Sequence, residues 1–321
     1  MNEGKRNAAH RTRIDETAAG QRIDNYLMRM ARGVPKSHIY RVLRGGEVRV
    51  NGRRVRQTYR LAIGDEVRIP PLRAAAPTPT PTPFSVPAPA GGPLPVVFED
   101  DALMVLDKPA GHAVHGGSGV SFGVIERLRA QRPEARMLEL AHRLDRETSG
   151  LLIVAKKRSA LTALHDMMRE GRMEKRYLAL VAGQWPNPVQ HIRAPLYKYL
   201  TAGGERRVRV SDEGKPAHSI VRLLKRWRGF SLVEVELKTG RTHQIRVHLA
   251  HLGFPLAGDD KYGDFALNKT LEGEGLRRMF LHAARLVFAH PLTGARLALD
   301  APPPPELQGF IARLDAQEPT A

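Results

Sequence analysis

One short polar stretch has residue types that could do chemistry: Ala141-His142-Arg143-Leu144-Asp145-Arg146-Glu147-Thr148-Ser149-Gly150. It lies between two apolar runs, residues 138–141 and 151–155, whose length suits buried strands better than helices. A carboxylate on a loop between rigid strands can be presented in a cleft. Arg143 and Arg146 flank Asp145, and a nearby opposite charge favours the ionised form of a carboxyl group. Asp145 is therefore a candidate nucleophile or base.

Other interpretations of these residues need to be weighed. Asp145 could simply anchor a surface loop through its neighbouring arginines. A retaining glycosidase would use two carboxylates about 5 Å apart, and Asp145 with Glu147 is the only local pair. His243, His248 and His251 could indicate a metal site, but no Cys or carboxylate completes it and the spacing lacks His-Glu-x-x-His.

Composition narrows the function classes. The 321 residues, 42% of them hydrophobic, suffice for about two domains. The chain has no cysteine, no apolar run of the roughly eighteen residues that a membrane span needs, and no apolar signal segment, so we expect a cytoplasmic protein that does not bind membranes. Its 51 Lys and Arg against 33 acids give a net charge of +18, which indicates a polyanionic partner, nucleic acid first.

The first part of the chain predicts a small basic domain. We expect a flexible tail over residues 1–20, a domain over 21–71 and an Ala/Pro/Thr-rich linker over 72–94. Apolar spacing predicts helices over 22–31 and 36–44, and Asn51-Gly52 predicts a hairpin between strands at 47–50 and 53–55. Residues 1–75 carry 17 Lys and Arg and 7 acids, a net of +10, which is more than half of the excess charge.

This arrangement, with the string Gly45-Gly46-Glu47-Val48-Arg49-Val50-Asn51-Gly52-Arg53, resembles the RNA-binding domain first known from small-subunit ribosomal protein S4. The resemblance implies that cations of this domain contact RNA phosphates, which contributes affinity without sequence reading. The candidates are Lys36, Arg41, Arg44, Arg49 and Arg53.

The remainder, residues 95–321, predicts one larger domain. Strand-like runs outnumber helical ones and do not alternate with them, so we expect an α+β fold with a mixed, largely antiparallel sheet, beside a small N-terminal α/β domain. The strand-like runs include residues 102–106, 151–154, 177–181, 219–224, 231–237 and 285–289; helices are expected near 159–171 and 242–253.

Four stretches of this domain together resemble the RluA-type pseudouridine synthases: Asp107-Lys108-Pro109-Ala110-Gly111, the Asp145 stretch, Glu174-Lys175-Arg176-Tyr177, and Gly240-Arg241-Thr242-His243-Gln244-Ile245-Arg246-Val247-His248. The resemblance implies isomerisation of uridine in RNA. The bond from ribose C1′ to uracil N1 is broken and the base is rejoined through C5, with no cofactor and no metal. It favours large-subunit (23S) ribosomal RNA as the substrate and a monomeric enzyme. The alternatives are a transfer RNA synthase of the same family and a non-catalytic ribosome-associated factor.

The resemblance also implies roles for single residues. Asp145 becomes the catalytic carboxylate, which could attack the sugar, abstract a ribose proton or attack uracil C6. Tyr177, at the start of a strand-like run, would stack on the uracil, and Arg241 would pair with Asp145. Arg143 would fill the gap that the extruded uridine leaves in the RNA. Lys108 and His142 complete the set of residues expected to bind substrate RNA.

Overall fold

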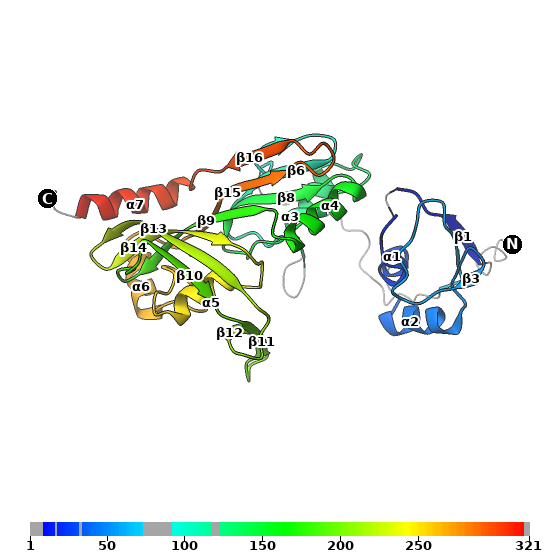
Figure 1. Cartoon of the computed structure of the whole chain (residues 1–321), viewed down its shortest axis with the longest axis horizontal. Coiled ribbons are helices and arrows are strands. Elements are labelled where there is room, and N and C mark those ends of the chain that lie inside the picture. Colours follow the sequence, from blue (N-terminus) through cyan, green and yellow to red (C-terminus); the bar gives the residue numbers. More distant parts are fainter. Residues whose placement is uncertain (1–8, 17, 32–33, 73–91, 117–121, 318–321) are drawn as a thin grey trace. The chain divides into compact units, whose positions relative to one another are not determined.

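The computed structural model describes residues 9–16, 18–31, 34–72, 92–116 and 122–317 (Figure 1). The chain divides into two compact units, Met1–Ala90 and Gly91–Ala321. Residues 73–91 of the predicted linker lie outside the described residues.

In the N-terminal unit, two helices and a four-stranded antiparallel sheet share one core. The strand order is β1-β4-β2-β3. Along the chain the elements are β1 (His10–Arg13), α1 (Ile23–Met30), α2 (Lys36–Gly45), β2 (Arg49–Val50), β3 (Arg53–Arg54) and β4 (Glu66–Ile69).

Local sequence explains most of this unit. The predicted helices are present because one apolar stripe of each is buried, with Leu27 of α1 and Ile39 of α2 fully enclosed. The predicted hairpin is confirmed: β2 pairs with β3, and Asn51 (φ +49°) and Gly52 (φ +76°) both take the left-handed conformation that a two-residue turn of this type requires.

The predicted flexible tail is wrong for its second half. β1 pairs with β4 in antiparallel register, from His10 opposite Ile69 to Arg13 opposite Glu66. Ile14 and Ala18 are buried in the core of this unit. Backbone pairing with β4, rather than buried side chains, holds this charged strand in place. Its sequence therefore has no apolar alternation from which the strand could have been predicted.

The C-terminal unit contains the other elements. Helices are α3 (Val124–Gln131), α4 (Arg158–Arg169), α5 (Gln244–His251), α6 (Phe265–Gly273) and α7 (Pro305–Gln317). Strands are β5 (Val96–Glu99), β6 (Leu103–Lys108), β7 (Glu139–Leu140), β8 (Ser149–Ala155), β9 (Glu174–Ala182), β10 (Val189–Arg193), β11 (Leu196–Leu200), β12 (Arg206–Val210), β13 (His218–Trp227), β14 (Phe230–Leu237), β15 (Leu281–Ala289) and β16 (Arg296–Asp300).

A ten-stranded sheet organises this unit, in the order β10-β13-β14-β9-β15-β8-β6-β5, with β16 paired to β15 and β7 to β8. β11 and β12 form a separate hairpin. Of the pairings within the large sheet, only β15 with β8 is parallel among the described residues. The predicted α+β class with a mixed, largely antiparallel sheet is confirmed.

Helices cover both faces of the sheet around β6 and β8, which explains why β8 is buried along its whole length and β6 along most of it rather than in alternation. Met104 and Leu106 share a core with residues of α3 and α5, whereas Leu103 and Val105 pack with α4 on the opposite face. Tyr177 of β9 belongs to the first of these cores, so its side chain lies on the α5 face.

Gly150 allows the Asp145 loop to enter β8 beside β15. It has a φ of +104°, and a Cβ atom at this position would lie 2.3 Å from the carbonyl oxygen of Ala283. Any side chain would therefore force apart the parallel pair of strands.

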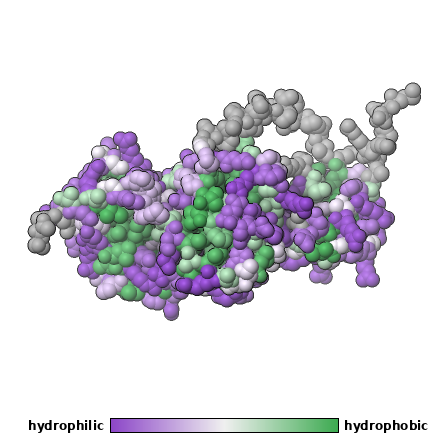
Figure 2. Space-filling model, turned by 90° about the horizontal axis from the view of Figure 1, so that it is seen from above, coloured by the Kyte–Doolittle hydropathy of each residue, from purple (hydrophilic) through white to green (hydrophobic). Residues whose placement is uncertain are grey.

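Hydrophilic residues cover much of the face seen in Figure 2, with hydrophobic residues between them. In the described ranges, no helix is both long enough and apolar enough to cross a membrane.

Candidate active site

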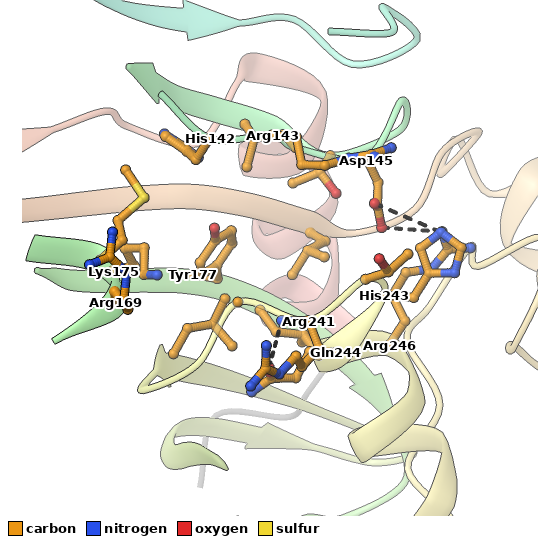
Figure 3. A pocket seen from close by; sticks show the side chains of 18 residues that line it. His142, Arg143, Asp145, Arg169, Lys175, Tyr177, Arg241, His243, Gln244 and Arg246 are labelled. Carbon is orange, nitrogen blue, oxygen red and sulfur yellow. Dashed lines mark hydrogen bonds and ion pairs between the residues drawn. The ribbon is translucent and has the colours of Figure 1, made fainter. Parts of the chain in front are cut away.

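Asp145 lies at a cleft of about 380 Å³ on the α5 face of the large sheet (Figure 3). Three segments form most of it: the loop between β7 and β8, the start of β9, and the turn that leads into α5; the end of α4 and single residues of β14 and β15 complete the lining. The lining residues with charged or polar side chains are His142, Arg143, Asp145, Thr148, Arg169, Lys175, Tyr177, Arg241, Thr242, His243, Gln244 and Arg246.

Arg246, in the first turn of α5, is the cation that pairs with Asp145. Its Nη1 lies 3.4 Å from Asp145 Oδ2, and His243 Nε2 lies 3.8 Å from Asp145 Oδ1. The Asp145 side chain is 21% exposed, so it remains accessible from the cleft. Arg246 and His243 thus orient the Asp145 carboxylate, which contacts the protein on one side and faces the cleft on the other.

Arg246 is itself held by a buried carboxylate. Its Nε donates to Asp259 Oδ2 at 2.7 Å and its Nη2 to Asp259 Oδ1 at 2.6 Å, a two-pronged contact that only a guanidinium can make. Its guanidinium also lies 5.2 Å from the centre of the Tyr262 ring. Burial acts against the charge, but the hydrogen bonds to Asp259 and the negative charges of Asp259, Asp145 and Asp260 together outweigh it, so the pKa of Arg246 is raised. Arg246 thus presents a fixed positive charge to Asp145.

The predicted ion pair between Arg241 and Asp145 is wrong. Arg241 precedes α5, is exposed, and donates from Nε to the carbonyl oxygen of Pro216 at 3.0 Å. Its backbone N–H donates to Gln244 Oε1 at 3.0 Å, which fixes the turn but does not direct the side chain to Asp145. Arg241 and Arg246 belong to the same motif stretch. Because α5 begins at Gln244, Arg246 lies on the helix and faces Asp145, whereas Arg241 lies in the turn before it.

The turn before α5 carries a strained residue. His243 has a φ of +53°, an unusual conformation for a residue with a side chain. Its ring Nδ1 lies 2.8 Å from the Tyr262 hydroxyl. His243 lies within the turn that the hydrogen bond from the Arg241 N–H to Gln244 Oε1 closes, directly before the first residue of α5. The contact with Tyr262 holds the ring beside Asp145.

Tyr177 is the fourth residue of β9 rather than its first, and its side chain is 7% exposed. Burial, followed by the negative charge of Asp145, raises the pKa of Tyr177, so the phenol is neutral at physiological pH. Its hydroxyl has no hydrogen-bond partner within the described part of the chain. An apolar ring with a free hydroxyl in a cleft suits stacking against a planar base.

Lys108 is not available to RNA, which corrects its predicted role. The side chain is fully buried, and Nζ donates to the carbonyl oxygens of Pro109 at 2.8 Å, His112 at 2.9 Å and Arg146 at 3.1 Å. Burial, with a smaller contribution from the charge of Arg278, lowers the pKa of Lys108 to about 7. The bond to Arg146 ties the residue after Asp145 to the end of β6.

Arg278 holds the same loop one residue further along. Its Nη2 donates to the carbonyl oxygen of Glu147 at 3.1 Å and to Ser149 Oγ at 2.8 Å. Sequence reasoning missed this residue, since nothing nearby in the sequence relates it to Asp145. Two cations, the buried Lys108 and the largely buried Arg278, therefore bind successive carbonyl groups after the candidate carboxylate.

The arginines that flank Asp145 do not bracket it as predicted. Arg146 donates from Nε to the carbonyl oxygen of Gly111 at 3.0 Å and pairs with Glu147 at 3.4 Å. Arg143 is exposed at the cleft and has no ion pair with any described residue. Its insertion into an RNA helix stays a prediction.

His142 supports the start of the loop. Its Nε2 accepts a hydrogen bond from the Ile153 N–H at 3.1 Å. Burial, followed by the charge of Lys175, lowers the pKa of His142 to about 3, so the ring carries no positive charge. A contact between His142 and RNA stays a prediction.

The competing interpretations find little support in this geometry. Glu147 lines a different pocket, on the side of Lys108 and Arg278, and Asp145 is the only carboxylate among the described residues that line the cleft. The pair that a retaining glycosidase needs is therefore not formed. His248 is buried and uses both ring nitrogens, toward Ser219 Oγ and Ala194 O at 3.0 Å each, so it cannot join His243 around a metal.

Comparison with known proteins decides the family. Residues 102–251 match the family model described as RNA pseudouridylate synthase, and residues 21–67 match the S4 domain. The chain is 53% identical over 303 residues to ribosomal large subunit pseudouridine synthase C of Escherichia coli, covering 94% of this chain and 95% of that protein. The chain belongs to the RNA pseudouridine synthase family. The synthase is also 50% identical over 305 residues to the protein of that name from Pasteurella multocida, covering 95% of this chain and 94% of that protein.

Solved structures agree with this assignment. The synthase is similar to human RNA pseudouridylate synthase domain containing 4, with a TM-score of 0.56 and 26% identity over 69% of this chain and 93% of that one. The family predicted from the four motif stretches is confirmed, and with it an isomerase activity.

Proposed function

We propose that this synthase converts specific uridines of large-subunit ribosomal RNA to pseudouridine, with Asp145 as the catalytic carboxylate. The observation that carries the proposal is the Asp145–Arg246 ion pair at a cleft that Tyr177 also lines. The chain is also more than 50% identical to a large-subunit synthase over nearly its whole length. The reaction breaks the bond from C1′ to N1 and forms one from C1′ to C5, while a proton leaves C5 and another is gained at N1.

Each cleft residue has a part in this reaction. Asp145 acts beside the target nucleotide as nucleophile or base, and Arg246 keeps it ionised and oriented. Tyr177 stacks on the uracil, so that the base can turn over on an apolar surface without water. Deuterium at ribose C2′ separates two routes for Asp145: a primary isotope effect supports proton abstraction, and its absence favours attack on the sugar or on uracil C6.

Exposed cations of the N-terminal unit supply phosphate contacts in this proposal. Lys36, Arg41, Arg44, Arg49 and Arg53 are all exposed, and within the described ranges none of them forms an ion pair. The match to the S4 domain supports an RNA partner for this surface. Exposed cations that form no ion pair can replace the counterions of RNA.

A second groove supports an RNA substrate longer than one nucleotide. It adjoins the cleft, since Gly240 and Arg241 line both, and it continues to the β11–β12 hairpin. Tyr197 of this hairpin lines the groove, and the guanidinium of Arg209 lies 5.8 Å from its ring centre and 5.5 Å from that of Tyr199. Aromatic rings beside cations suit unpaired nucleotides next to the target.

Pseudouridine mapping of total RNA from cells with and without this gene tests the proposal. We expect defined large-subunit positions to lose the modification, and the gene for the wild-type chain, but not for Asp145→Asn, to restore it. Loss confined to transfer RNA would contradict the substrate, and an unchanged map would contradict the activity itself.

A further inference from the structure

Lys175 is a buried cation for which the described residues supply no partner. Its side chain lies on β9, is 8% exposed, and lines the catalytic cleft. Across the described residues, its ammonium forms no hydrogen bond and no ion pair, and burial alone lowers the pKa of Lys175. Burying a charge without an acceptor is unfavourable, and such groups in native proteins call for an explanation.

The other buried cations of this region show what Lys175 lacks. Lys108 donates to three carbonyl oxygens, Arg246 is held by Asp259, and Arg278 donates to Glu147 O and Ser149 Oγ. Each of them binds protein oxygen atoms and is satisfied before any substrate arrives. Of these four cations, only Lys175 has no protein acceptor among the described residues, and it lines the cleft, where a substrate acceptor can reach it.

The order of groups along the cleft places Lys175 relative to a substrate. Lys175 and Tyr177 alternate on β9, so they share a face and lie about 7 Å apart along the strand. The charge of Asp145 acts on Tyr177, whereas the charge of Lys175 acts on His142. In Figure 3 Tyr177 is drawn between Lys175 and Asp145. The cleft thus runs from Asp145 past Tyr177 to Lys175.

A target uridine has a defined direction in such a cleft. If the ribose lies at Asp145 and the base stacks on Tyr177, as in the proposed function on which this step rests, the base edge remote from the ribose points to Lys175. The group directly opposite N1 in the uracil ring is the C4 carbonyl. We propose that the Lys175 ammonium binds O4 of the target uracil and, after the base has turned over, O2 of the product.

The symmetry of uracil makes one ammonium sufficient for both. Turning the ring about the line through N3 and C6 exchanges N1 with C5 and C2 with C4, so O2 arrives where O4 was. When the C1′–N1 bond breaks, its electron pair leaves with the base, which later supplies an electron pair from C5 to form the new bond to C1′. Charge on the detached base spreads onto both carbonyl oxygens, and a buried ammonium stabilises it strongly.

The same contact selects the base. Cytosine carries an amino group at C4, which offers the ammonium a donor instead of an acceptor and leaves Lys175 unsatisfied. A phosphate is the other anion in RNA that could meet a lysine. Arg143 and Arg169 are exposed at the same cleft and are therefore more accessible to a phosphate than Lys175, which is buried.

Atom replacement in the substrate, combined with Lys175→Met, tests the contact. Single-turnover rates are measured with the full chain in excess over an RNA fragment that holds the target uridine or 4-thiouridine, whose sulfur accepts weaker hydrogen bonds. We expect Lys175→Met to slow conversion of uridine by about a hundredfold, with RNA affinity within about twofold. Wild type should lose about tenfold on 4-thiouridine, and Lys175→Met should lose almost nothing more.

Control variants keep the outcome interpretable. Lys269→Met, at an exposed lysine of α6, should match wild type on both substrates. Thermal unfolding should show Lys175→Met at least as stable as wild type, because a buried unpartnered charge is removed. Lys175→Gln, which keeps an N–H donor, should recover part of the rate.

The assignment would be overturned if Lys175→Met converted uridine at the wild-type rate. It would also be overturned if the losses from Lys175→Met and from 4-thiouridine were independent of each other. A third contrary result is that the Lys175→Met loss depends on a methylphosphonate substitution beside the target and not on the change at O4. If the methionine variant did not fold, an unchanged wild-type rate on 4-thiouridine would overturn it equally. Wild-type conversion of ordinary uridine in the same RNA tests the proposed function separately, so failure of one can be told from failure of the other.

Discussion

The cations compared here have different surroundings in the two units of this synthase. In the N-terminal unit, Lys36, Arg44 and Arg53 are exposed and have no ion pairs among described residues. In the C-terminal unit, Lys108 and Arg246 are buried and bound to protein oxygen atoms. Closeness to the Asp145 loop therefore does not make a basic residue a better candidate for RNA contact. A cation that is already bound to protein oxygen atoms, as Lys108 is, is not available to RNA. Changing each kind of cation should affect different measurements.

The largest effect belongs to the group that the buried cations position. Asp145→Asn should lower the single-turnover rate by more than about a thousandfold, because the amide keeps the shape but cannot act as nucleophile or base. RNA affinity should stay within a few-fold. Asp212→Asn, at an exposed acid, is the control and should behave as wild type. A near-normal rate in the Asp145 variant would remove it from catalysis.

Arg246→Lys tests whether a buried cation acts through geometry rather than charge. Lysine keeps the charge but cannot bind Asp259 with two prongs and still reach Asp145. We expect about a hundredfold slower single turnover, which is about 2.7 kcal/mol of barrier, at unchanged RNA affinity. A variant that turned over normally but bound RNA weakly would show that Arg246 contacts RNA instead.

The exposed cations should show the reverse pattern. Replacing Lys36, Arg41, Arg44, Arg49 and Arg53 by Gln in the full chain should weaken binding to structured rRNA and leave the rate at saturating enzyme within about twofold. Each lost phosphate contact should flatten the log–log salt dependence of binding by about 0.7–0.9. If the slope of the fivefold variant matched that of wild type, this surface would not be the RNA contact.

Lys108→Met separates a structural lysine from one that binds RNA. The variant leaves three carbonyl oxygens without their donor, so the free energy of unfolding should fall by about 3 kcal/mol, while RNA affinity of the folded protein barely changes. Denaturant unfolding and binding titrations measure the two effects. Loss of affinity with full stability would restore the role expected from sequence.

What could be predicted from sequence was local, and what could not was long-range. Short-range spacing sufficed for α1, α2 and the Asn51-Gly52 hairpin, and the four motif stretches together sufficed for the family and the fold class. β1 was missed because its pairing partner lies more than fifty residues away. The catalytic roles of Asp145 and Tyr177 stay predictions.

The candidate site shows the same division. Its segments could be named from the motif stretches, but the contacts of their side chains depend on where α5 begins and on which groups close over β6. Lys108 is fully buried, and one of the three carbonyl groups that it binds belongs to Arg146, to which no sequence spacing relates it. Burial and partner choice are properties of the packed chain, so exposure had to come from the structure.

Arg241→Lys should have the smallest effect, and it is the sharpest companion to Arg246→Lys because the two arginines are five residues apart. The Arg241 side chain is exposed and donates one hydrogen bond to Pro216 O, which a lysine can also make. The bond from its backbone N–H to Gln244 does not depend on the side chain. We therefore expect single-turnover rates within about twofold of wild type and a small change in affinity at most, measured beside Arg246→Lys on the same RNA. A drop of tenfold or more at unchanged affinity would mean that Arg241 turns toward Asp145 when RNA is bound, and would return to it the role that the sequence first suggested.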